Sequence, residues 1–266
     1  MRFAAITMPR LALALLTLLA LSAPLSAAEI RVMNSGGFTA AYRDLLPAFE
    51  RATGHSVVTA WGASMGTAPD AIPVRLARGE AADIVILAES GLENLIRQGK
   101  VDPASRVDLA RSSIGMAVRA GAPRPDISSA EALRKTLLEA RSIAYSASAS
   151  GVYVSTELYQ RLGIADQVGP KSRQILSERV GNVVARGDAE IGFQQISELL
   201  PIQGIDFVGP LPAELQRVTV FSAGILVAAR EPEAARQLIG FLASPAAFET
   251  VTRTGLEPMA ATARQP

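Results

Sequence analysis

The chain of 266 residues contains no cysteine and a single histidine, His55. The lack of cysteine excludes a disulfide framework, a thiolate nucleophile, a zinc–thiolate site and a lipid-modified cysteine anchor. One histidine is too few for the usual multi-histidine metal sites, so we expect no metal site. Hydrophobic residues make up 49% of the chain and charged residues 19%, which excludes a disordered chain.

The chain also lacks an excess of either charge, with 26 lysines and arginines against 25 acids. Residues 1–28 hold two of these cations and no acid, which leaves 24 cations against 25 acids in the remainder. A nucleic-acid-binding protein normally shows a basic stripe, so we expect no nucleic-acid partner. The length fits one large domain or two lobes of roughly 100–150 residues each.

The first 28 residues have the pattern of an export signal. Arg2 and Arg10 precede an apolar run at 11–21 that is too short to span a bilayer. Small residues follow at Ser26, Ala27 and Ala28. We expect cleavage near Ala28 and a periplasmic protein; an uncleaved anchor is disfavoured because no second apolar run follows.

The remaining chain alternates between strand-like and helix-like patterns, which predicts an α/β fold with mainly parallel sheets flanked by helices. Expected strands are 30–33, 56–61, 82–88, 114–119, 143–145, 191–193, 205–208 and 218–228. Expected helices are 38–52, 67–78, 92–99, 130–140, 152–162, 180–186, 233–242 and 245–254. Pro47 should kink the first of these helices or end it early.

Two similar lobes are the predicted organisation. The segments 79–84 and 187–192 resemble each other, each being a helix end, an acidic turn and an entering strand. The best positions for the chain to cross between lobes are 111–119 and 210–220. We therefore expect lobe 1 to comprise residues 29–115 and 215–266, and lobe 2 to comprise residues 116–214.

Small residues and hydroxyls gather in four turns, at 34–37, 63–67, 146–151 and 194–197. Turns at the carboxyl edge of an open α/β sheet are where ligands bind, and free N–H groups at helix starts favour anions. Helix capping and turn formation are the alternative explanation. The candidate ligand-binding residues are Ser35, Gly36, Gly37, Ser64, Met65, Gly66, Ser148, Ser150, Gly151, Tyr153, Gln194 and Gln195. Arg179 could also touch a ligand, although a surface charge fits it better.

Familiar catalytic motifs do not fit. Residues 62–66 match G-x-S-x-G, but in that hydrolase fold the histidine follows the serine, whereas His55 precedes Ser64. The sole Gly-Lys pair, at 99–100, is followed by valine rather than Ser or Thr, and no G-x-G-x-x-G follows the first strand. We expect no nucleotide or other cofactor.

The order of elements from Glu29 to Pro258 resembles the type II periplasmic binding proteins, in particular their molybdate-binding group. The resemblance is carried by segments 62–64, 82–86, 208–212, 232–236 and 241–242. It implies two α/β lobes that close on a ligand in the cleft between them. Two positions depart from the molybdate pattern, since Gly37 replaces a serine before the first helix and Gln195 replaces a tyrosine.

A narrower resemblance is to the periplasmic aconitate isomerases, which share this fold. The segments 64–66, 69–73, 75–78, 148–153, 183–187 and 192–195 carry it. It implies a small tricarboxylate ligand and an allylic proton shift that interconverts trans- and cis-aconitate. The base would lie within hydrogen-bond reach of the transferred proton; Glu198, Glu178 and Tyr153 are the candidates.

The alternative is a non-catalytic binding protein that delivers an oxyanion or organic acid to an ABC importer permease. In either case we expect a small anionic ligand and a monomer, because both lobes must be free to move.

Overall fold

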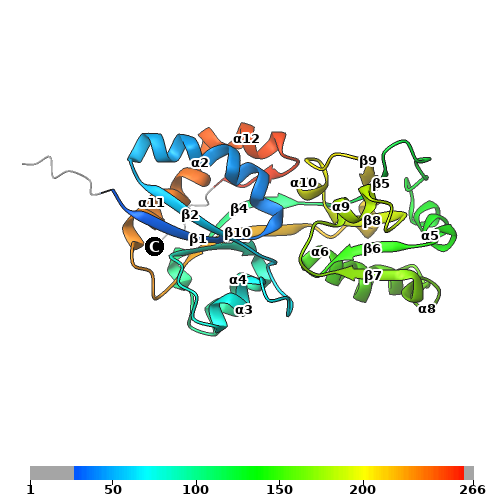
Figure 1. Cartoon of the computed structure of the whole chain (residues 1–266), viewed down its shortest axis with the longest axis horizontal. Coiled ribbons are helices and arrows are strands. Elements are labelled where there is room, and N and C mark those ends of the chain that lie inside the picture. The colour runs from blue at the N-terminus through cyan, green and yellow to red at the C-terminus, as the bar shows by residue number, and fades with distance from the viewer. Residues whose placement is uncertain (1–26, 261–266) are drawn as a thin grey trace, which may run out of the picture.

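Two β-sheets lie side by side in the computed structural model, which describes residues 27–260 (Figure 1). The first sheet has the order β11-β4-β10-β3-β1-β2 and the second the order β7-β6-β8-β5-β9. The strands of the first sheet are β1 (Glu29–Asn34), β2 (Ser56–Trp61), β3 (Ile84–Ala88), β4 (Val107–Ser112), β10 (Thr219–Ile225) and β11 (Glu257–Pro258). Those of the second are β5 (Ile114–Arg119), β6 (Ile143–Ser146), β7 (Ser172–Ile175), β8 (Ile191–Gln195) and β9 (Ile205–Pro210). The chain thus passes between sheets at Ser113 and between Pro210 and Thr219.

Helices cover both faces of each sheet (Figure 1). The first sheet packs against α2 (Thr39–Thr53), α11 (Pro232–Leu242) and α12 (Phe248–Arg253) on one face, and α3 (Ile72–Ala77) and α4 (Glu89–Arg97) on the other. The second sheet packs against α5 (Ala130–Glu139), α6 (Ala149–Tyr153), a π-helical turn η3 (Val154–Leu158), α7 (Tyr159–Arg161) and α8 (Ala165–Val168) on one face, and α9 (Val180–Ala185) on the other. The short helix α10 (Ile196–Leu199) follows β8 directly, and the 3-10 turns are η1 (Gly36–Phe38), η2 (Pro103–Ser105), η4 (Gly169–Lys171), η5 (Ala213–Leu215) and η6 (Pro245–Ala247).

Burial explains why the central strands were readable from the sequence. All five residues of β3 are buried, as are all five of β8, so both strands are covered on two faces; β3 is a continuous apolar run, and β8 is apolar or small as far as Phe193. Helix α2 buries one face through Tyr42, Leu45 and Phe49 against the first sheet. The predicted α/β architecture of two helix-flanked sheets is confirmed.

The strand directions differ from the prediction of mainly parallel sheets. Strands β1, β2 and β3 pair in parallel, and so do β6, β7 and β8. The strands reached by crossing between sheets, β5 and β10, pair antiparallel with both of their neighbours. The sheets are therefore mixed, because a strand that enters from the other sheet arrives in the opposite direction.

Two expectations about the helices differ from the structure. Helix α2 continues through Pro47 to Thr53, so the early end was wrong; Pro47 is exposed, while its neighbours Leu45 and Phe49 bury the face that holds the helix in place. The helix expected at 67–78 begins only at Ile72, with Pro73 in its first turn. The turn at 63–67 therefore does not open a helix.

Most of the predicted signal peptide lies outside the described residues. Within residues 27–260, no helix combines the length and apolar character that crossing a membrane requires.

Candidate functional site

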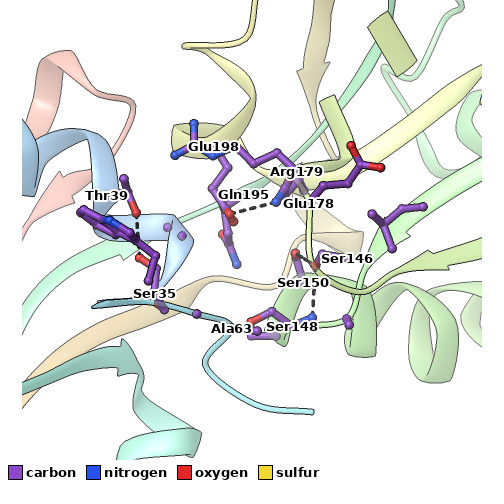
Figure 2. Close-up of a pocket in the computed structure, with 18 of the residues that line it drawn as sticks. Ser35, Thr39, Ala63, Ser146, Ser148, Ser150, Glu178, Arg179, Gln195 and Glu198 are labelled. Atoms are coloured by element: carbon purple, nitrogen blue, oxygen red, sulfur yellow. Dashed lines mark hydrogen bonds between the residues drawn. The ribbon is translucent and has the colours of Figure 1, made fainter. Parts of the chain in front are cut away.

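A pocket of about 340 Å³ lies between the two sheets, at the ends of β1, β2, β6, β7 and β8 (Figure 2). Segments of the first sheet form what we call the first wall: Ser35, Gly36, Gly37, Thr39, Arg43, Trp61, Gly62, Ala63, Asp70 and Phe221. Segments of the second sheet form the second wall: 146–150, 175–179, Gln194, Gln195 and Glu198. The candidates brought together here are Ser35, Gly36, Gly37, Ser148, Ser150, Glu178, Gln194, Gln195 and Glu198.

Glu198 is the buried carboxylate of the second wall. It is only 8% exposed, and burial raises its pKa from 4.5 to about 7, against the opposing effects of the positive charge of Arg179 and a hydrogen bond from Gln194. A carboxylate with a pKa near neutrality takes up and releases protons at physiological pH, which is the property of a general acid–base group. Figure 2 shows it on the same side of the pocket as Gln195.

A relay of hydrogen bonds holds this carboxylate. The Nε2 of Gln194 donates to Oε1 of Glu198 at 2.8 Å, and the Oε1 of Gln194 accepts from the backbone N–H of Val180 at 2.9 Å. Because the Oε1 of Gln194 accepts from Val180, the first residue of α9, the Nε2 on the other side of the amide faces Glu198. The side chain of Gln194 thus fixes the carboxylate and is itself fixed by the backbone.

The other two candidate bases are engaged elsewhere. Glu178 lines the pocket, but both of its oxygens accept from Arg186 at 2.9 and 3.0 Å, and this pairing lowers its pKa. Tyr153 lies outside this pocket; its hydroxyl donates to the carbonyl of Leu215 at 2.5 Å and accepts from Arg161 at 3.0 Å. Of the three candidates, only Glu198 is a lightly engaged base that faces the pocket.

Four other candidates also fall outside the lining: Ser64, Met65, Gly66 and Gly151. The hydroxyl of Ser64 accepts from the backbone N–H of Ala88 at 2.9 Å, and its own N–H donates to Oγ of Ser148 across the interface at 3.3 Å. Gly151 serves packing, because a β-carbon there would lie 1.6 Å from the carbonyl oxygen of Ser146. These residues shape the turns that form the site.

Two polar atoms of the lining are buried without a partner among the described residues: Oγ of Ser35 and Oε1 of Gln195. Ser35 and Ser148 occupy N-cap positions of η1 and α6, yet neither side chain makes a capping hydrogen bond. Capping therefore does not explain these serines, and unsatisfied buried polar atoms facing a cavity are what a ligand would satisfy. The amide of Gln195 bonds Oγ1 of Thr219 through Nε2 at 2.9 Å. The hydroxyl of Thr219 can both donate and accept. If the amide rotates by half a turn, its Oε1 accepts from this hydroxyl and its Nε2 faces an anion in the pocket.

Two arginines, one on each wall, supply positive charge. Arg43 of α2 stacks over the ring of Trp61 at 4.6 Å, and Arg179 immediately precedes α9. Within residues 27–260, neither guanidinium makes a hydrogen bond or ion pair with the protein. Arg43 was not among the residues predicted from the sequence, and Arg179 was expected at the surface. No group of three or more histidine or acidic side chains in the described chain is arranged to hold a metal.

Comparisons with known proteins identify the family of the chain and proteins similar to it. Residues 30–257 match the family described as bacterial extracellular solute-binding protein. The chain is 47% identical over 258 residues to the aconitate isomerase of a Pseudomonas species, covering 95% of this chain and 98% of that one. It is 25% identical over 247 residues to the molybdate-binding protein ModA of Rhodobacter capsulatus, covering 92% and 94%. The solved structure of the Azotobacter vinelandii periplasmic molybdate-binding protein superposes with a TM-score of 0.70 at 23% identity, covering 85% and 98%.

Proposed function

This chain belongs to the bacterial extracellular solute-binding protein family, and on that premise we propose that it is an aconitate isomerase in which Glu198 moves the proton. The high identity to a named aconitate isomerase over nearly the whole of both chains supports the activity. The single observation that carries the mechanism is the buried carboxylate of Glu198, with a pKa near 7, in a pocket whose lining also offers hydroxyls, amides and two arginines that have no ion-pair partner among residues 27–260.

The reaction is a proton shift across three carbons. Ionised Glu198 takes a proton from the methylene carbon of aconitate, which lies between a carboxylate and the double bond. The electron pair left behind spreads over the allylic carbons and the adjacent carboxylate. The protonated side chain then returns a proton to the other end of the allylic system, which moves the double bond and exchanges the trans and cis forms. No proton is gained or lost overall.

Neutral donors and the two arginines hold the substrate. The developing negative charge needs hydrogen-bond donors. The hydroxyl of Ser35 is a donor without a partner among the described residues, and the amide of Gln195 offers its Nε2 once it turns away from Thr219. Arg43 on the first wall and Arg179 on the second carry positive charges that pair with carboxylates of the substrate. A tricarboxylate thus finds cations and a base in one pocket.

The family and its relatives indicate a periplasmic protein with a small anionic ligand. We propose further that the signal peptide is cleaved near Ala28, that lobe 1 comprises 29–115 and 215–266, and that lobe 2 comprises 116–214. The mature protein is proposed to act as a monomer.

The test is turnover by the purified chain from Glu29 onward. Incubation with trans-aconitate should produce cis-aconitate, followed by chromatography, and the products formed in D₂O should carry deuterium at the allylic carbons. E198Q serves as the control, because it keeps the shape of the side chain and removes the base. Tight binding of aconitate with neither conversion nor deuterium uptake would reject the isomerase.

The second candidate is a binding protein that serves an ABC importer, and the ModA relatives favour it. The two functions differ in ligand preference. Stabilisation against heat by molybdate but not by aconitate would select the binding protein, and a ligand at one hundred times its dissociation constant adds about 2.7 kcal/mol.

A further inference from the structure

Helix α10 carries Glu198 on the second wall. Ser197, the residue before Glu198, bonds this helix to the first wall. The hydroxyl of Ser197 donates to the backbone carbonyl of Gly37 at 2.6 Å. Ser197 is 2% exposed and Gly37 is buried, so this bond between the two walls is shielded from water. Buried hydrogen bonds are not exchanged with solvent and fix the relative position of their partners firmly.

The carboxylate of Glu198 also lies against the first wall. A β-carbon added to Gly36 would lie 1.9 Å from Oε1 of Glu198, so the carboxylate occupies the space that any larger residue would fill. Helix α10 is also tied down at its start, where the N–H of Ile196 donates to the carbonyl of Ser113 at 2.9 Å. Gly255 closes the other side, since a β-carbon there would lie 2.6 Å from Cδ1 of Leu200.

We propose that Ser197 is a positioning residue, whose bond to Gly37 holds the Glu198 carboxylate against Gly36 and away from water. This inference rests on the proposed isomerase function, and it assigns a role to a serine that does not line the pocket. Glu198 belongs to the second wall, and Gly36, which covers its carboxylate, belongs to the first. The hydrogen bond from Ser197 to Gly37 therefore sets how deeply the carboxylate is buried.

Few charges act on Glu198 from the elements that pack around it. Turn η1 brings no ionisable group, β8 brings the neutral Gln194 and Gln195, and α9 is preceded by Arg179. Helix α2 contributes Arg43 to the same pocket, and Asp70 and Glu178 line it as well. All of these charges remain when Ser197 is replaced, so a change in the titration of Glu198 in S197A reports its position and its contact with water.

The test compares the pH profiles of kcat and KM for S197A and the wild type. The variant should lose about 10- to 100-fold in kcat, because small displacements of a reacting group are costly, while KM changes much less. The acid limb of its profile should move to lower pH, since water reaches the carboxylate and lowers its pKa. S197T keeps the hydroxyl and should keep the wild-type acid limb.

Two other serine variants distinguish this positioning role from a general loss of rigidity when a serine hydrogen bond is removed. S244A removes a hydroxyl-to-carbonyl bond of similar length, to Phe241 at 2.7 Å, remote from the pocket, and should behave as the wild type. S177A removes another serine bond between the walls, to Asp70 at 3.3 Å, and should leave the acid limb in place. An S197A enzyme with wild-type kcat and an unmoved acid limb would overturn the inference while leaving the isomerase function intact.

A measurement independent of turnover completes the test. Carbon NMR of glutamate-labelled protein, with the Glu198 signal assigned by its loss in E198Q, follows the titration of this carboxylate directly. Its pKa should fall in S197A toward the ordinary value of 4.5 and stay raised in S244A. Equal titration of Glu198 in both variants would reject the positioning role even if no isomerase activity were found.

Discussion

The carboxylate of Glu198 lies so close to Gly36 that a β-carbon at this glycine would come within 1.9 Å of Oε1. G36A should therefore displace the base and lower kcat by about 100-fold or more, since misplacing a reacting group by an ångström has an effect of this size. The loss should appear in kcat more than in melting temperature, because the clash falls on the end of a side chain. Steady-state kinetics and thermal unfolding of the same preparation give both quantities.

Gly240 is the matched control for this substitution. It lies inside α11, and a β-carbon there would meet nothing within 4 Å. G240A should raise the stability by up to about 1 kcal/mol, because alanine favours a helix interior over glycine, and leave turnover unchanged. If G36A proved as harmless as G240A, the Glu198 carboxylate would not lie against Gly36 during turnover.

Removing the charge of Glu198 should abolish the proton shift and keep the binding. E198Q retains an oxygen that accepts from Gln194 but has no basic carboxylate, so kcat should fall by about 100- to 10,000-fold. Calorimetric titration should show that aconitate still binds. If E198Q still introduced deuterium into aconitate at the wild-type rate, the base would be another residue.

The ligand-free stability should also depend on Glu198 in a predictable direction. Burial raises its pKa to about 7 in the folded state, against 4.5 in the unfolded chain. Between these values the folded protein binds one proton more than the unfolded one, so stability falls as the pH rises through this window, by about 3 kcal/mol at most. E198Q lacks this slope and should be more stable than the wild type at pH 8, with the difference vanishing near pH 4. Chemical denaturation at a series of pH values measures this; parallel curves for the two proteins would contradict the raised pKa.

The alternation of strands and helices was predictable because its signal is local. Strands β2 and β5 have the bounds that the sequence indicated, since each is rich in β-branched or apolar residues and is followed by a turn that contains glycine. Strand β7 was missed because Arg173 and Gln174 face solvent at the edge of the second sheet, where an exposed strand shows no apolar pattern. The antiparallel direction of β5 and β10 follows from the crossings between sheets, which no local pattern encodes.

The site was predictable in outline, because the strand ends that carry small and hydroxyl residues do meet in one pocket. The individual roles were not. Ser64 looks like a ligand-binding serine, but the backbone N–H of Ala88, 24 residues away, occupies its hydroxyl. Glu178 and Glu198 are equal as sequence candidates, and only the three-dimensional partners, Arg186 for one and Gln194 for the other, separate them.

Arg179 shows the same limit of local sequence patterns. A charged residue before a helix is read as surface unless its lack of a counter-ion is known, and among residues 27–260 no carboxylate pairs with this guanidinium. R179M should raise KM for aconitate by about 10- to 100-fold, the effect of losing one charge-assisted hydrogen bond. It should also move the acid limb of the pH profile upward, because the positive charge of Arg179 lowers the pKa of Glu198 and its removal takes this opposing effect away.

R43M should raise KM less, since Arg43 is exposed and screened by solvent. R236M, which removes an exposed arginine paired with Glu233 on α11, is the control and should change neither quantity. A rise in KM without movement of the acid limb would mean that Arg179 binds substrate but lies too far from Glu198 to influence its proton.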